Sequence, residues 1–166
     1  EDAPSGVSQI KKWRFGNGKD IADPDEMNFD ASSANNSYTF DRGWIKKIQE
    51  DGFKASITPV KAFASKNNNP FGLYDLSGNV YEWCWDWYSG DLSDQTDKYY
   101  TECRESGISL NPRGAKTGRF RVIRGGSWNH LALETRSVYR HRVSPILQFN
   151  SLGFRVAQRG LHSIYH

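Results

Sequence analysis

Aromatic and polar residues alternate most regularly in the middle of the chain. An aromatic side chain occurs there at every second position, at Tyr81, Trp83, Trp85 and Trp87. A period of two is that of a β-strand, whose successive side chains point to opposite faces. Gly78 and Asn79 directly precede this run and accept backbone angles that other residues resist. The pattern therefore predicts a turn followed by a strand.

The remaining apolar positions predict only short elements. Three further strands are expected over residues 119–124, 137–143 and 152–156, and one short helix is expected over residues 41–51. Connections rich in Gly, Asn and Ser separate these elements. Short strands and turns outnumber helices, and we find no internal repeat and no interdomain linker.

Composition narrows the classes of function. The chain has 166 residues, which is enough for one domain with a hydrophobic core. Apolar residues make up only 37%, but aromatic residues reach 14% and bury a large area from few positions. The formal charge of +3 requires neither nucleic acid nor a membrane surface as a partner. No apolar run approaches the ~20 residues of a spanning helix, so no transmembrane segment is expected.

Three blocks of sequence carry a family resemblance. They are Glu50–Phe53 with Thr58–Val60, then Asn69–Trp87, then Arg121–Trp128 with Leu152–Val156. In this order they resemble the formylglycine-generating-enzyme, or sulfatase-modifying-factor, domains. The resemblance implies an α+β, C-type-lectin-like fold with short antiparallel strands and long irregular loops, formed as a single domain over residues 1–166. Since family domains usually begin further upstream, we expect the C-terminal part of a longer domain, with the N-terminal half as a missing partner.

The cysteines bear on catalytic activity. The oxidases of this family need a pair of cysteines after a Gly-Gly-Ser sequence, because a thiolate holds copper and activates the substrate thiol. Gly-Gly-Ser ends here at Ser127, but residues 127–152 contain no cysteine. The chain is therefore expected not to generate formylglycine and not to be an enzyme. Cys84 lies among tryptophans and is interpreted as a small buried hydrophobe, and a Cys84–Cys103 disulfide is the alternative in an exported protein.

Two other classes of function stay open. One is a metal-dependent oxidase of the same family that lacks its other half. Iron-dependent relatives use two histidines and a glutamate on a separate helical domain, which this sequence does not contain. His130, His141 and Glu134 can be drawn as such a set, although surface histidines that bind no metal are commoner. The other is a structural or regulatory domain whose residues 130–151 form a fixed partner interface.

A second resemblance covers residues 125–157. Its fixed points are Gly125–Trp128, Ala132, Arg136, Ser137, Arg140, Pro145 and Gly153–Ala157. They resemble the scaffold of the variable proteins of diversity-generating retroelements, in which a reverse transcriptase mutates the adenines of AAC asparagine codons. Twelve positions between the fixed points, here called the variable set, carry residues that such changes reach: His130, Leu131, Leu133, Tyr139, His141, Val143, Ser144, Ile146, Leu147, Phe149, Asn150 and Ser151.

The variable set has the chemistry of a binding surface. It mixes aromatic, aliphatic and small polar side chains without a clean period, unlike a core strand or a polar loop. The alternative is that its apolar members pack inside the protein. Four neighbours are assigned to the scaffold, where the arginines are expected to donate hydrogen bonds to loop carbonyls: Trp128, Arg136, Arg140 and Phe154.

These observations favour a non-enzymatic ligand-binding protein of the receptor or adhesin kind. Its variable set would form a diversified surface for a protein or surface ligand, and no nucleic-acid partner is expected. The resemblance to variable proteins implies export and display at a bacterial cell surface.

The family resemblance also implies two structural calcium sites. The first ligand set is the Asn28 side chain, the Phe29 carbonyl, the Asp51 carboxylate and the Phe53 carbonyl. The second set is Asp75, the Gly78 and Val80 carbonyls, and Glu82. Hard oxygen ligands of this kind suit calcium, which takes six to eight of them. The alternative is that Asp51 and Asp75 cap turns and that Glu82 accepts backbone hydrogen bonds.

Overall fold

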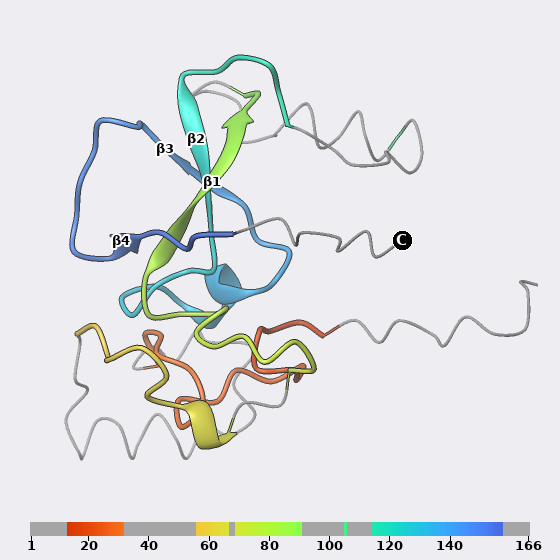
Figure 1. The fold of residues 1–166 in the computed structure, drawn as a ribbon, viewed down its shortest axis with the longest axis vertical. Helices are drawn as coiled ribbons and strands as arrows, with labels where there is room; N and C mark the ends of the chain where they lie inside the picture. The colour runs from red at the N-terminus through yellow and green to blue at the C-terminus, as the bar shows by residue number, and fades with distance from the viewer. Residues whose placement is uncertain (1–12, 32–55, 67–68, 91–104, 106–113, 158–166) are drawn as a thin grey trace, which may run out of the picture. The chain divides into compact units, whose positions relative to one another are not determined.

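The computed structural model describes residues 13–31, 56–66, 69–90, 105 and 114–157 (Figure 1). These residues fall into two compact units, each assembled from two separate stretches of chain. The loop unit comprises the chain up to Val80 together with Gly125–Tyr139, and the sheet unit comprises Tyr81–Arg124 together with the chain from Arg140. The helix predicted over residues 41–51 lies outside the described residues.

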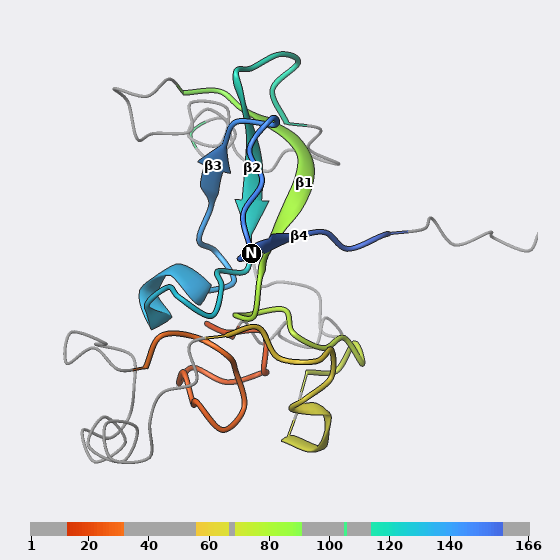
Figure 2. The ribbon, with the colours of Figure 1, turned by 90° about the vertical axis from the view of Figure 1, so that its left-hand side faces the viewer.

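The sheet unit holds the strands of the described part. They are β1 (Tyr81–Tyr88), β2 (Phe120–Arg124), β3 (His141–Val143) and β4 (Leu152–Gly153), in the order β3-β2-β1-β4. Figure 2 shows β3, β2 and β1 side by side, with β1 bent along its length. The predictions of β1 and β2 are confirmed. The prediction of an antiparallel sheet is wrong at one edge, because β4 pairs with β1 in parallel.

The other two predicted strands form only in part. The Tyr139 amide donates a hydrogen bond to the Arg136 carbonyl (2.9 Å), which closes a turn before β3 begins at His141. In the strand predicted over residues 152–156, only Leu152 and Gly153 pair with β1. The length of each of these strands is therefore set by the neighbouring strand with which it pairs. The local sequence does not show that pairing.

The pairing of β1 with β2 contains a bulge. Trp83 pairs with Ile123 and Trp87 pairs with Arg121, so three residues of β1 lie opposite one residue of β2. A bulge bends a strand and changes the direction of its side chains. Trp85 lies in the middle of this bulge and is 87% exposed. The regular alternation expected from the sequence is therefore interrupted at this residue.

A small hydrophobic core holds the sheet unit together. Tyr81, Ile123 and Val143 contribute buried side chains from β1, β2 and β3, and Trp83 and Leu152 pack against them. Each of the four strands thus supplies at least one side chain to the cluster. The core depends on the register of all four strands, since it draws on so few residues from each.

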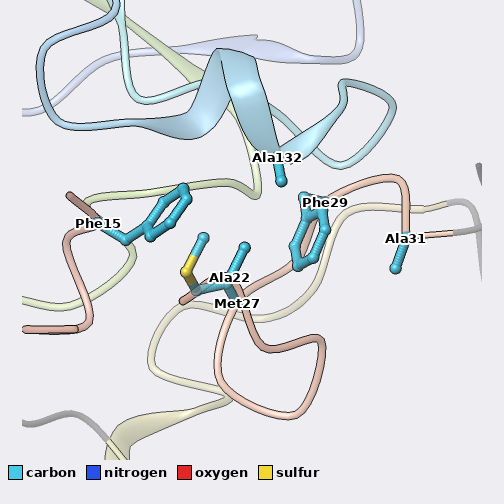
Figure 3. Close-up of a cluster of buried hydrophobic side chains, with 6 residues drawn as sticks. All are labelled: Phe15, Ala22, Met27, Phe29, Ala31 and Ala132. Atoms are coloured by element: carbon cyan, nitrogen blue, oxygen red, sulfur yellow. The ribbon is translucent and has the colours of Figure 1, made fainter. Parts of the chain in front are cut away.

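The loop unit has little regular structure in its described part, which contains the short 3₁₀ helices η1 (Ala64–Lys66) and η2 (Ala132–Thr135). Figure 3 shows its core, with Phe15 and Phe29 on opposite sides of Met27 and with Ala132 of η2 above them. None of the described helices has the length and apolar character needed to cross a membrane. The architecture is of the α+β kind, with short strands and long loops.

A buried turn, Ser77–Asn79, joins separate segments of the loop unit. The Ser77 hydroxyl accepts a hydrogen bond from the Gly16 amide (2.8 Å) and donates one to the Thr135 carbonyl (2.7 Å). The Gly78 amide donates to the Gly125 carbonyl (2.7 Å). Three backbone segments that are distant in sequence are therefore fixed to one turn.

Asn79 makes the densest set of these contacts. Its amide donates to the Asn28 carbonyl (2.7 Å), and its carbonyl accepts from the Trp128 amide (2.9 Å). Its side-chain Oδ1 accepts from the Thr58 amide (2.9 Å). Asn79 has a φ of 68°, in the left-handed region, where asparagine is one of the few tolerated residues other than glycine.

The turn predicts a large difference between two glycine substitutions. Gly78 has a φ of +84°, and an added Cβ would overlap the Asn28 carbonyl oxygen. We expect Gly78→Ala to lower the free energy of unfolding by about 3 kcal/mol or more, because backbone strain and overlap combine. Gly72 has a φ of +64° with no atom within 4 Å of its Cβ position, so Gly72→Ala is expected to cost about 1 kcal/mol. Urea denaturation measures both values, and equal losses would contradict the role given to the turn.

Candidate ligand-binding segment

The segment that carries the variable set passes from one unit to the other. Residues up to Tyr139 belong to the loop unit, and residues from Arg140 belong to the sheet unit. In the loop unit the fixed residues Ser127 and Ala132 are fully buried, and so is the neighbouring Thr135. These scaffold positions are therefore packed inside the loop unit.

The Gly-Gly-Ser sequence has a packing role in this unit. Gly126 has a φ of +70°, and a Cβ there would lie 2.6 Å from Cγ2 of Thr135. A side chain at this position would meet both strain and overlap. Glycine is thus required by the close approach of η2, independently of any chemistry in the family.

The variable-set residues of the loop unit lie nearer the surface. Leu133 is exposed, whereas His130, Leu131 and Tyr139 are half-buried. Nδ1 of His130 lies 2.6 Å from Oγ of Ser127, which fixes one edge of the imidazole ring against the scaffold. These side chains reach the solvent boundary, but only Leu133 extends well into solvent.

Glu134 serves as a structural brace in this unit. One carboxylate oxygen accepts from the Leu131 amide (3.2 Å), and the other accepts from the Tyr139 hydroxyl (3.4 Å). Within the part of the chain that the structure describes, three or more His, Cys, Asp or Glu side chains nowhere gather as a metal-binding group. Of the set of two histidines and Glu134 that the sequence allows, His130 and Glu134 belong to the loop unit and His141 belongs to the sheet unit.

In the sheet unit, the connection from β3 to β4 carries the most exposed members. Ile146 is 85% exposed, and Leu147 and Phe149 are also exposed. Asn150 is exposed as well, whereas His141 and Ser144 are half-buried. A turn closed by the Leu147 amide and the Ser144 carbonyl (3.0 Å) supports this loop. Several large apolar side chains thus face solvent on a short connection.

Two members of the variable set depart from the expected exposure. Val143 is only 9% exposed, because it is paired with Arg121 of β2 and packs in the core of the sheet unit. Ser151 is 3% exposed, and its carbonyl accepts a hydrogen bond from the Tyr81 amide (2.8 Å). These two buried residues anchor the two ends of the exposed β3–β4 loop. They are therefore not part of the candidate binding surface.

The scaffold residues are placed less uniformly than expected. Nε of Arg136 donates to the Leu133 carbonyl (2.9 Å), so the prediction of an arginine bonded to a loop carbonyl is confirmed there. Arg140 forms an ion pair with Asp86 (3.9 Å). Trp128 is half-buried. Phe154 is 76% exposed, which contradicts a packed scaffold role, because β4 ends before it.

The first calcium set is only partly described. Asn28 and Phe29 are buried, whereas Asp51 and Phe53 lie outside the described residues. The Asn28 side-chain amide donates to the Ser56 carbonyl (2.9 Å), so Asn28 contacts the chain that follows the other half of the set. Calcium at this first set stays a prediction.

At the second calcium set, which stays a prediction, Glu82 is already paired with an arginine. Nε of Arg155 lies 2.9 Å from Oε2 of Glu82, and Nη2 of Arg155 lies 2.6 Å from Oε1. A two-pronged arginine already neutralises this carboxylate. Asp75, in the loop unit, accepts a hydrogen bond from the Lys61 amide (2.8 Å), as the turn-capping alternative expected.

Cys84 lacks the environment of a reactive thiolate. It is half-buried and carries a free thiol, while Cys103 lies outside the described residues. Burial raises the pKa of the Cys84 thiol above its ordinary value. Copper binding and thiol activation need the opposite shift. Cys84 is therefore unsuited to replace the missing cysteine pair.

Residues 1–160 match the family described as "Sulfatase-modifying factor enzyme 1-like domain". The chain belongs to this family. The match includes residues of both compact units. The α+β architecture observed here is that of the family's C-type-lectin-like fold.

Proteins similar to this chain include a protein kinase, a formylglycine-generating enzyme and an inactive homologue of that enzyme. The serine/threonine-protein kinase pkn1 of Chlamydia caviae is 40% identical over 114 residues, which cover 69% of this chain and 16% of that protein. The formylglycine-generating enzyme of Thermomonospora curvata is 43% identical over 79 residues, 48% of this chain and 22% of the enzyme. The inactive C-alpha-formylglycine-generating enzyme 2 of Mus musculus is 34% identical over 116 residues, 65% of this chain and 28% of that protein. The chain thus spans less than a third of each of these relatives.

Two solved structures are also similar to the chain. Treponema denticola variable protein 1 shares 33% sequence identity with a TM-score of 0.44, over 61% of this chain and 31% of that one. PvdO from Pseudomonas aeruginosa shares 28% identity with a TM-score of 0.47, over 63% of this chain and 34% of that one.

The raised pKa of Cys84 predicts how fast its thiol reacts with an alkylating reagent. Because its pKa is raised, less thiolate is present at a given pH, and alkylation is expected to be slower than that of free cysteine. Iodoacetamide labelling at pH 8, in a Cys103→Ser variant, measures the rate. The same variant unfolded in urea is the control and should react at the rate of free cysteine. Faster labelling of the folded chain would mean an activated thiol.

Proposed function

We propose that this chain is a non-enzymatic ligand-binding domain of the sulfatase-modifying-factor family. Its binding surface is formed by exchangeable side chains between residues 130 and 150. One observation carries the proposal: within a single segment, the fully buried fixed residues Ser127 and Ala132 contrast with exposed apolar residues such as Ile146. A rigid frame can carry exchangeable side chains only if the residues of the frame are buried and the exchangeable ones are exposed.

The loop between β3 and β4 has the energetics of a contact surface. Burying an exposed leucine, isoleucine or phenylalanine side chain contributes about 1.5–3 kcal/mol. Ile146, at 85% exposed, leaves most of that free energy available to a partner, and Leu147 and Phe149, at 50% and 40%, leave part of it. Val143 and Ser151 hold the loop at both ends, so less conformational entropy is lost when a ligand binds.

The proposed ligand is a protein or another surface molecule encountered outside the cell. The fixed points over residues 125–157 support a variable protein of a diversity-generating retroelement, exported to a bacterial surface. A near-repeat of the 3′ end of the gene, rich in AAC codons, would add independent support. The pattern of fixed and variable positions does not specify one ligand, because a surface that varies between copies of the gene would bind many ligands.

The competing enzyme hypothesis makes a distinct prediction. With no cysteine in residues 127–152, no thiolate pair is available for copper. We expect no oxygen uptake when the chain, loaded with Cu(I) or Fe(II), receives a cysteine-containing sulfatase peptide. An authentic formylglycine-generating enzyme under the same conditions is the positive control. Uptake that depends on the peptide would overturn the non-enzymatic proposal.

Binding is predicted to depend on the exposed members of the variable set. One display library randomises Leu133, Ile146, Leu147 and Phe149, and a matched library randomises the buried pair Val143 and Ser151. We expect the first library to yield folded variants that bind serum albumin, used as an arbitrary protein target. Substitutions at exposed sites usually change the free energy of unfolding by within about 0.5 kcal/mol.

The matched library supplies the control. Val143→Ala is expected to lower the free energy of unfolding by about 2 kcal/mol, because it opens a cavity in the core. The buried library should therefore lose protease-resistant members before it yields binders. Equal loss of folded members from both libraries, or no binders from the first, would contradict the proposal.

A further inference from the structure

Among the described residues of the sheet unit, the most exposed aromatic side chain lies outside the variable set. Trp85 is 87% exposed in the bulge of β1. The sequence pattern assigns it to a regular strand, so nothing in the pattern marks it as a surface residue. Bulges are over-represented at sheet edges and next to active sites, where they change the direction of a side chain.

Arg121 holds this tryptophan in place. Its guanidinium lies 3.5 Å from the ring centroid of Trp87 and 5.4 Å from that of Trp85. It also donates a hydrogen bond to the Trp85 carbonyl, which the bulge leaves out of the regular ladder. A guanidinium has five N–H donors. Arg121 therefore braces the bulge and keeps donors for another acceptor.

Two hollows adjoin this pair of residues. One, of ≈ 310 Å³, is lined by Trp83, Cys84, Trp85, Arg121 and Pro145. The other, of ≈ 320 Å³, shares Trp85 and Arg121 and adds Lys116. We call the surface formed by Trp85, Arg121 and Lys116 the tryptophan–arginine platform. Each hollow has the size of a small ligand pocket.

The platform is positively charged. The two acids of β1 are already paired, Glu82 with Arg155 and Asp86 with Arg140. No carboxylate lines either hollow in the described part of the chain. Since none of the described acids is paired with Arg121, an acidic group that entered would meet its guanidinium without displacing one of them.

We propose that the platform docks an acidic polypeptide segment. An Asp or Glu carboxylate binds Arg121 and Lys116, and an apolar side chain of the same segment packs on Trp85. Tryptophan and arginine are the residue types that most often dominate the free energy of protein–protein contacts. A nucleic acid or sulfated polysaccharide draws its affinity from a long series of cationic contacts, whereas the platform has two cations. The proposal uses residues outside the variable set and does not rest on the proposed function.

Fluorescence anisotropy of the full chain with a fluorescein-labelled peptide, Asp-Phe-Glu-Asp-Phe-Glu, tests this site. Trp85→Ala and Arg121→Gln are each expected to weaken binding at least about tenfold, as truncation of a dominant contact does. Arg119→Gln is the matched control, since it removes the same charge from an exposed residue outside both hollows. It should change the affinity by less than about twofold. A peptide with Lys in place of Asp and Glu should not bind.

Unfolding in urea is measured for every variant, because Arg121 also braces the bulge. Where a variant unfolds, Trp85→Phe and Arg121→Lys take its place and are expected to give intermediate losses of affinity. Absence of binding by the parent chain, or equal affinity of parent and variants, overturns the proposal. Tighter binding of oligothymidylate or heparin than of the peptide also overturns it, in favour of a general polyanion surface.

Discussion

The loop unit depends on the hydrogen bonds of one buried turn, Ser77–Asn79. Asn79 alone joins Asn28, Thr58 and Trp128 through its amide, carbonyl and side chain. Buried polar groups of this kind are costly when left without partners, so the network specifies one arrangement of the loops that contribute to it. The hydrophobic cluster around Phe15 and Phe29 is small. Polar contacts, more than core volume, therefore determine how this irregular unit is shaped.

The same constraint is compatible with the proposed variation of a segment of the chain. Trp128 is tied to Asn79 by its backbone amide, and Thr135 is tied to Ser77 by its backbone carbonyl. Backbone contacts do not depend on the identity of nearby side chains. Substitutions at exposed positions between such ties leave the frame unchanged, whereas Gly126 cannot vary because a side chain would collide with Thr135. In the sheet unit, Val143 and Ser151 have the same anchoring role for the β3–β4 loop.

Local sequence predicted the strands whose pattern is strong and missed the features set by distant partners. The alternation from Tyr81 and the run that ends at Arg124 gave β1 and β2. The parallel pairing of β4 with β1 has no local signal, since it depends on which edge of the sheet is free. The bulge that exposes Trp85 arises from a mismatch in register between two strands, each of which looks regular alone. For the same reason, the composition of the variable set did not distinguish buried Val143 from exposed Ile146.

In the sheet unit, the proposed tryptophan–arginine platform adjoins part of the proposed variable surface. Pro145, a scaffold position, lines the same hollow as Trp85 and Arg121, and it directly precedes the exposed Ile146. On the two proposals made above, a bound segment would meet constant chemistry at the platform and exchangeable chemistry on the adjoining loop. Specificity is a difference between affinities, so a constant anchor supplies affinity to all acidic ligands while the loop distinguishes among them. Such an arrangement lets weak new contacts become useful after few substitutions, because the loop does not have to provide the whole free energy of binding.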